Sequence, residues 1–189
     1  SDVCSSDLTS GSSYLIGGEL SIDSAHVVVD ANITLETAGN LSITATGSTG
    51  NSESGIDVNA AAGGTTTLRA LGSSNITLNG TSGDQWSTNA EGVELGDTAG
   101  GNVLVETASG DITIVGVAAG NADEGIVVEA TTIQTTAGGS ITLNGTAGNG
   151  NPSNTTDPLN TDNDGISFEG NAIVYAQAGG DISITGVDR

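Results

Sequence analysis

The chain has 189 residues, including 30 glycines but only two prolines, one Phe, one Trp and two Tyr. Its 23 carboxylates stand against two arginines, for a formal net charge of −21. This charge repels phosphate backbones and anionic headgroups, which argues against nucleic-acid and membrane-surface partners. No apolar run approaches the roughly 18 residues that would predict insertion into a membrane. Because the apolar residues are mostly Ala, Val and Ile, the composition favours an all-β fold with a narrow core.

Residues 1–8, with the sequence SDVCSSDL, resemble the translation of a sequencing adapter. We therefore expect a non-native segment there, which would remove the single cysteine, Cys4, from the natural protein and with it any disulfide chemistry. Since the chain contains no methionine, we expect residues 9–189 to be a β-solenoid fragment that is truncated at both ends.

The first predicted strand of each repeat is an apolar–hydroxyl–apolar triplet. Its period of two is typical of a strand that buries one face, and a small turn-forming residue comes before each copy. The triplet occurs six times: Leu20-Ser21-Ile22, Leu41-Ser42-Ile43, Ile76-Thr77-Leu78, Ile112-Thr113-Ile114, Ile141-Thr142-Leu143 and Ile182-Ser183-Ile184.

Two further strands follow each triplet in constant order. The second strand usually follows a glycine, and the third runs into a closing turn; the register of the third strand is open near Ile133. The second strands are Val27-Val28-Val29, Ile56-Asp57-Val58, Val93-Glu94-Leu95, Ile126-Val127-Val128 and Ile166-Ser167-Phe168. The third strands are Ile33-Thr34-Leu35, Thr66-Thr67-Leu68, Val103-Leu104-Val105, a stretch near Ile133, and Ile173-Val174-Tyr175.

Three short strands per repeat predict a single-stranded parallel β-helix of about five complete rungs, because each strand can stack on its counterpart about 4.8 Å along the axis. The triplets recur after 21, 35, 36, 29 and 41 residues, which is too irregular for the blades of a β-propeller. Most of the extra length falls between the first and second strands, so we expect loop insertions along one edge. They span 46–54, 79–91, 115–124 and 144–164.

Three phrases resemble the repeats of filamentous-haemagglutinin-like exoproteins and related large repetitive bacterial adhesins: AGNLSI at 38–43, AGGSITL at 137–143 and AGGDISI at 178–184. The resemblance covers nearly all of the chain beyond Leu8. It implies a right-handed β-helix shaft that is secreted or displayed at the cell surface and serves in attachment. The expected partners are a glycan or protein of a host or environmental surface, and the neighbouring rungs of the same longer chain.

The insertion 144–164 contains a cluster of carboxylate and amide oxygens. Ca²⁺ takes six to eight such oxygen ligands, so Asp157, Asp162 and Asp164 are candidate calcium ligands, and calcium is the one candidate cofactor. The alternative is a solvated polar loop. In the insertion 79–91, Trp86 is a candidate glycan contact because an exposed indole can stack on a sugar face. Alternatively, its ring folds back over the coil.

Four polar residues, Ser54, Glu91, Glu124 and Asp164, precede the glycine of a second strand. Stacked rungs would bring the three carboxylates near one another at a corner, where we expect like charges to splay into solvent. Any affinity for a partner should reside on the insertion edge, since flat ladders of Ser and Thr offer few anchors.

We expect the chain to be non-catalytic. Asn160-Thr161-Asp162 is similar to a motif of polygalacturonases, which use paired carboxylates on glycosidic bonds. However, the single histidine, His26, lies beside a predicted core strand, and Arg69 is the one candidate base away from the chain end. The alternative is a fragment of a polysaccharide-active β-helix enzyme, a lyase or a glycoside hydrolase, whose catalytic rungs lie elsewhere.

Overall fold

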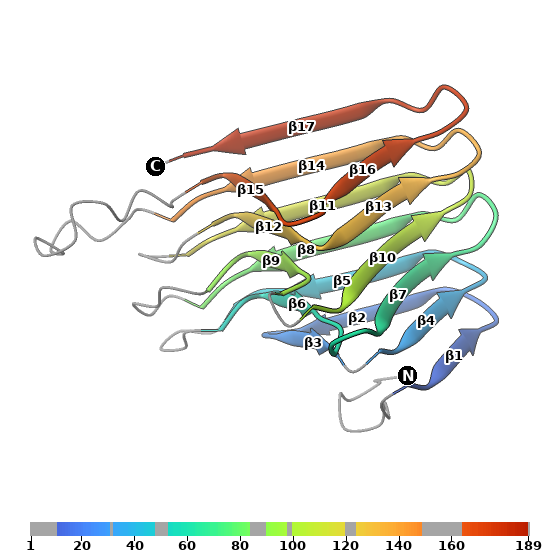
Figure 1. Ribbon diagram of the computed structural model, residues 1–189, viewed down its shortest axis with the longest axis horizontal. Helices are drawn as coiled ribbons and strands as arrows, with labels where there is room; N and C mark the ends of the chain where they lie inside the picture. The colour runs from blue at the N-terminus through green and yellow to red at the C-terminus, as the bar shows by residue number, and fades with distance from the viewer. Residues whose placement is uncertain are drawn as a thin grey trace, which may run out of the picture.

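The computed structural model describes residues 11–30, 32–47, 53–83, 90–97, 100–119, 124–148 and 164–188. Over these ranges the chain is all-β and winds as a coil of three parallel sheets, one strand of each sheet per rung (Figure 1). The predicted parallel β-helix is therefore confirmed. No helix in these ranges is long and apolar enough to span a membrane.

Each sheet collects one of the three predicted strand families. Sheet 1 contains β2 (Leu20–Ser24), β5 (Leu41–Ala45), β8 (Ile76–Thr81), β11 (Ile112–Val117), β14 (Ile141–Thr146) and β17 (Ile182–Val187). Sheet 2 contains β3 (Val27–Val29), β6 (Ile56–Val58), β9 (Val93–Leu95), β12 (Ile126–Glu129) and β15 (Ile166–Glu169). Sheet 3 contains β1 (Ser13–Ile16), β4 (Thr34–Thr37), β7 (Thr65–Ala70), β10 (Asn102–Thr107), β13 (Thr131–Thr135) and β16 (Ile173–Ala176).

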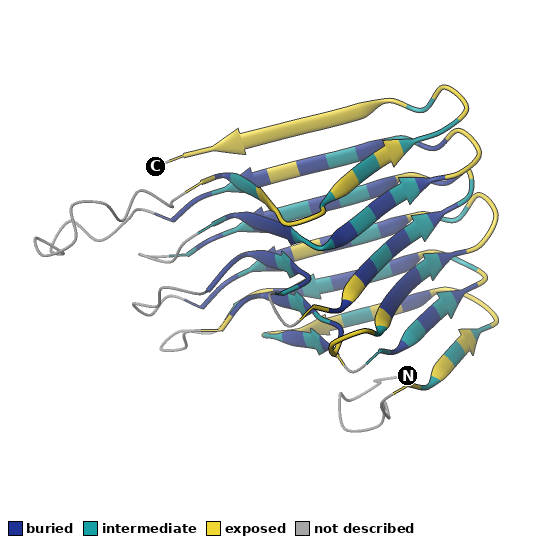
Figure 2. Cartoon of the chain, viewed as in Figure 1, coloured by how far each residue is buried: buried dark blue, intermediate teal, exposed yellow. Residues whose placement is uncertain are grey.

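The six triplets pair in parallel and in register, as predicted. Ile112 of β11, for example, lies opposite Ile76 of β8 and Ile141 of β14, and all three are fully buried. The alternation of buried and less buried residues along these strands is visible in Figure 2. On the edge strand β17 the equivalent Ile182 and Ile184 are exposed. Apolar stacks of Leu, Ile and Val therefore run along the axis and form the core.

Sheet 3 settles the register that the sequence left open. Ile133 of β13 lies opposite Val105 of β10 and Val174 of β16, so these three residues share the inward column. Ile173 and Tyr175, on either side of Val174, are both about half exposed. A run of three apolar residues carries no period-two signal, so pattern alone cannot decide which of them faces the core.

The corner between sheets 1 and 2 is built from two facing columns of glycine. One column lies within the strands of sheet 1, and the other precedes the strands of sheet 2. A Cβ on Gly116 would lie 2.0 Å from the carbonyl oxygen of Gly125, and one on Gly145 would lie 1.8 Å from that of Gly165. Only glycine lets the two backbones approach this closely. The sheet 1 column is Gly80, Gly116, Gly145 and Gly186.

This glycine corner also marks the insertion edge. Because the strands of sheet 1 are parallel and in register, β5, β8, β11 and β14 all end at the same edge of the coil (Figure 1). The segments that join them to sheet 2 are the long insertions recognised in the sequence. The predicted starts at 79, 115 and 144 were wrong, because the first three residues of each of these insertions continue a strand of sheet 1. The side chains at the roots of these insertions therefore come together at one corner of the coil.

Candidate functional site

Most of the residues predicted to bind a ligand lie outside the described residues. This holds for Trp86 and for the candidate calcium ligands Asp157 and Asp162. Asp164 is described and exposed, and its carbonyl oxygen accepts a hydrogen bond from the amide of Gly125 at 3.1 Å. Across the described ranges no group of three or more His, Cys, Asp or Glu side chains is arranged to hold a metal ion.

The structure instead brings together three carboxylates at the root of the insertions, on the outer side of sheet 2. We call Asp57, Glu91 and Glu94 the carboxylate cluster. Asp57 and Glu94 are neighbours in register on β6 and β9, and Glu91 lies just before β9. The Ser54 hydroxyl donates to Glu91 Oε2 at 2.7 Å and lies 3.4 Å from Glu94 Oε2. One hydroxyl thus contacts two of the three acids.

Burial governs the ionisation of this cluster. It raises the pKa of Glu94 to about 8, with further increases from the charges of Glu91 and Asp57, and the hydrogen bond from Ser54 opposes it. Burial likewise raises the pKa of Asp57 to about 6, while the nearby His26 lowers it. Removing a carboxylate from water disfavours its charged form, and like charges nearby add to this effect. At neutral pH Glu94 therefore retains a proton that an isolated carboxylate would lose.

The expectation that the corner carboxylates splay into solvent was wrong for Glu91, which is 7% exposed. Ser54 gives the physical reason. It occupies the equivalent position one rung earlier, where its hydroxyl can donate to Glu91 instead of repelling it. The sequence carried a signal for the cluster, because Asp57 and Glu94 are both the middle, outward residues of second-strand triplets.

His26 has a structural contact at the same corner. Its Nδ1 lies 2.5 Å from the carbonyl oxygen of Ser54 and the ring is half-buried. The ring thus links the turn before β3 to the segment before β6.

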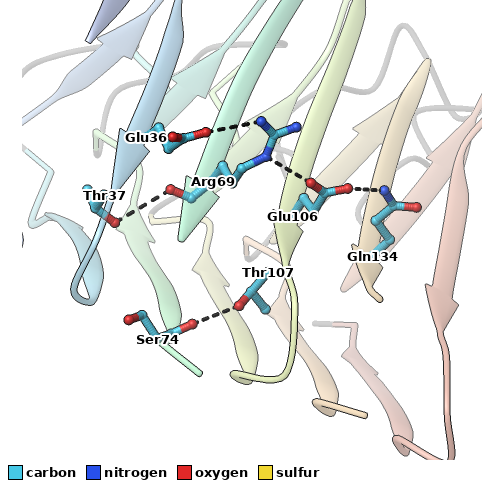
Figure 3. A network of polar contacts seen from close by, with 7 residues as sticks. All are labelled: Glu36, Thr37, Arg69, Ser74, Glu106, Thr107 and Gln134. Carbon is cyan, nitrogen blue, oxygen red and sulfur yellow. Dashed lines mark hydrogen bonds and ion pairs between the residues drawn. The ribbon is translucent and has the colours of Figure 1, made fainter. Parts of the chain in front are cut away.

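The outer side of sheet 3 carries a polar ladder that crosses four rungs (Figure 3). Arg69 of β7 donates from Nη1 to Glu36 of β4 at 3.1 Å and from Nε to Glu106 of β10 at 2.8 Å. Gln134 of β13 in turn donates to Glu106. Arg69 is therefore held between two carboxylates on sheet 3, and the carboxylate cluster lies on sheet 2.

The outer side of sheet 1 differs from the other two. From β5 to β17 its outward strand residues are Ser, Thr, Asn and Val, with no charged residue; we call this surface the hydroxyl face. Between these rungs an Asx ladder borders it: the Asn40 side-chain oxygen accepts from the Asn75 amide at 2.9 Å, and Asn75 from the Asp111 amide at 2.8 Å. The face consists of Ser42, Thr44, Thr77, Asn79, Thr81, Thr113, Val115, Val117, Thr142, Asn144, Thr146, Ser183, Thr185 and Val187.

Comparisons with protein-family models, with curated proteins and with solved structures gave no match to this chain.

Proposed function

We propose that this chain is a non-catalytic shaft segment of a secreted or surface-displayed bacterial adhesin, with its attachment groups on the insertion edge. The observation that carries the proposal is the unbroken stack of rungs, in which every strand between the two end rungs pairs with its counterparts on both sides. Such a solenoid gains stability from each interface between neighbouring rungs, so it can be long and still present loops along one line.

Outward side chains reinforce the stack where a shaft would need it. Arg69 joins three consecutive rungs through Glu36 and Glu106. The Thr107 hydroxyl donates to the Ser74 carbonyl at 2.8 Å, which links two rungs at the corner where sheet 3 ends (Figure 3). Contacts of this kind oppose the separation of one rung from the next, as a shaft under tension requires.

Labelling of intact cells tests the location of the protein. Antibodies raised against this chain should label unpermeabilised producer cells. The purified chain should also compete with those cells for binding to the surface to which the cells attach. Shortening 82–90 and 147–163 to tight turns should abolish the competition while circular dichroism still reports a folded β protein. Labelling that requires permeabilisation would exclude the proposal.

A second candidate function, polysaccharide cleavage, is favoured by one observation. The carboxylate cluster combines a carboxyl whose pKa lies near 8 with neighbouring acids on an outer face of a parallel β-helix. Glycoside hydrolases use such a pair, one protonated and one ionised. For a lyase the observation is less favourable, because the basic Arg69 is engaged on another sheet.

An assay of released reducing ends and of unsaturated products separates the two functions. The purified chain is incubated with neutral and acidic polysaccharides, beside the Glu94→Gln variant. The shaft proposal predicts no turnover by either protein. Turnover that Glu94→Gln abolishes would instead establish the enzyme.

A further inference from the structure

The three outer faces of the coil differ in the hydrogen bonds that their polar side chains make. On sheet 3 the outward groups bond one another, as Arg69 does with Glu36 and Glu106. On sheet 2 the Asn59 amide donates to Asp57, and Ser54 to Glu91. On the hydroxyl face the side chains from Ser42 to Thr185 form no hydrogen bond with another described residue. Their hydroxyl and amide groups are therefore free to bind something outside the chain.

The free groups form a regular two-dimensional array. Neighbouring rungs repeat them about every 4.8 Å along the axis, and alternate residues repeat them roughly every 6.7 Å along each strand. Thr77, Thr113 and Thr142 make one column, and Asn79, Val115 and Asn144 make the next. The strands of sheet 1 run nearly parallel across the rungs in Figure 1, so the array is extended and not curled around a ligand.

The distribution of charge narrows the choice of partner. In a chain with a net charge of −21, the hydroxyl face alone is free of charged strand residues between β5 and β17. It suits an uncharged partner. A sugar chain is disfavoured because the face contributes no aromatic ring on which a sugar could stack.

A second copy of the chain is also disfavoured. At about 4.8 Å per strand and about 3.4 Å per residue, the face covers roughly 400–500 Å². A stable interface needs about 800 Å² from each partner. The face is thus too small and too polar for a durable dimer.

We propose that the hydroxyl face binds ice, a crystalline and uncharged surface whose water molecules repeat in two dimensions over a few ångströms. The Ser, Thr and Asn groups hydrogen-bond to the outermost water layer, and the Thr and Val methyl groups fill the spaces between them. Ordered waters held by such groups are nearly as favourable as direct hydrogen bonds. The proposal does not depend on the adhesin function, since the array lies on the strands of sheet 1 and not in the insertions that follow them.

Partition into growing ice tests the proposal. The full chain, carrying a fluorescent label, is held against slowly growing polycrystalline ice, and the fraction taken up is compared with that of a label-matched inert protein. The double variant Thr113→Tyr and Thr142→Tyr places two bulky rings in one column of the face. Thr132→Tyr makes the same change on an outward position of sheet 3 and is the matched control. Circular dichroism confirms that each variant is folded.

We expect the wild type and Thr132→Tyr to enter the ice and to slow its recrystallisation, and the double variant to be excluded like the inert protein. Exclusion of the wild type would overturn the proposal. So would equal uptake of the double variant, or equal loss in Thr132→Tyr. Retention of the wild type by crystalline cellulose or chitin without any uptake into ice would assign the face to a neutral polysaccharide instead.

Discussion

The outer surfaces of sheets 1 and 2 lie on the same core but differ in almost every other respect. Both sheets bury columns of Leu, Ile and Val, and they meet at the glycine corner. Sheet 2 places Asp57 and Glu94 side by side in register, whereas the hydroxyl face of sheet 1 carries no charge. The inward apolar residues therefore hold the coil together, and the outward residues can differ in charge and polarity from one sheet to the other.

The two surfaces also differ in how far their polar groups are satisfied. Around the carboxylate cluster, Ser54 donates to Glu91 and Asn59 donates to Asp57, and burial raises the pKa of Glu94. On the hydroxyl face the polar groups face solvent without partners in the described chain. A closed polar network suits a structural or proton-holding role, while an open array suits contact with an outside surface.

The largest loss of stability should come from placing a carboxylate on the inward side of a strand of sheet 1. Ile112→Asp buries an unpaired carboxylate at a position that is 0% exposed, which should lower the free energy of unfolding by roughly 5 kcal/mol. Thr113→Asp, the next residue and outward, should cost less than about 1 kcal/mol. Urea denaturation followed by circular dichroism measures both. Similar losses in the two variants would contradict the assignment of faces.

The second-largest loss of stability should come from adding a side chain at the glycine corner between sheets 1 and 2. Gly116→Ala sets a Cβ 2.0 Å from the Gly125 carbonyl oxygen, so the backbones must separate, at a cost of about 3 kcal/mol. Gly17→Ala is the control, because a Cβ there meets no atom within 4 Å. Urea denaturation of both variants is the measurement. If Gly116→Ala were as stable as Gly17→Ala, the close approach of the sheets would be wrong.

Neutralising the carboxylate cluster should remove the main electrostatic difference between the surfaces. Because the pKa of Glu94 is raised from 4.5 to about 8, the folded state binds more protons than the unfolded state in that window. Stability therefore falls as pH rises from about 4.5 to 8 and levels off above. At about 1.4 kcal/mol per pKa unit, Glu94→Gln should be more stable than wild type by on the order of 2–3 kcal/mol at pH 9.

Denaturation at pH 5, 7 and 9 measures this effect, and Glu19→Gln, an exposed acid away from the cluster, is the control. Near pH 5 the wild type and Glu94→Gln should differ little. A gap that stays the same at pH 5 and pH 9 would show that Glu94 is ionised throughout.

The smallest effect should come from the Asx ladder beside the hydroxyl face. Asn75→Ala removes the oxygen that accepts from the Asp111 amide at 2.8 Å, and because the site is exposed, water replaces much of the bond. We expect a loss of about 1 kcal/mol, measured by thermal unfolding. Asn75→Asp keeps the oxygen and should retain wild-type stability, as Asp111 performs the same role toward the Ser140 amide. Equal losses in both variants would mean that the hydrogen bond contributes nothing.

The repeat itself could be predicted from particular residues. Ile76-Thr77-Leu78 and its five counterparts share a period of two and a turn residue, and these local features determine an inward and an outward face. The glycines before the second strands were equally visible. The opposing column at Gly80, Gly116 and Gly145 was overlooked, although the repeated Gly-Thr and Gly-Val pairs after the triplets were a readable signal.

The strand order, the inward columns of sheets 1 and 2 and the edge on which the insertions fall can all be predicted from local sequence, because each depends on neighbours only a few residues apart. The inward residue of β16, the β1 strand and the burial of Glu91 follow instead from tertiary contacts. These depend on which residues of different rungs become neighbours, at separations of 21–41 residues. Ser54 and Glu91 are 37 residues apart and yet share a hydrogen bond. A variable insertion in each rung sets such pairings, so they follow from the winding of the coil and not from any local pattern.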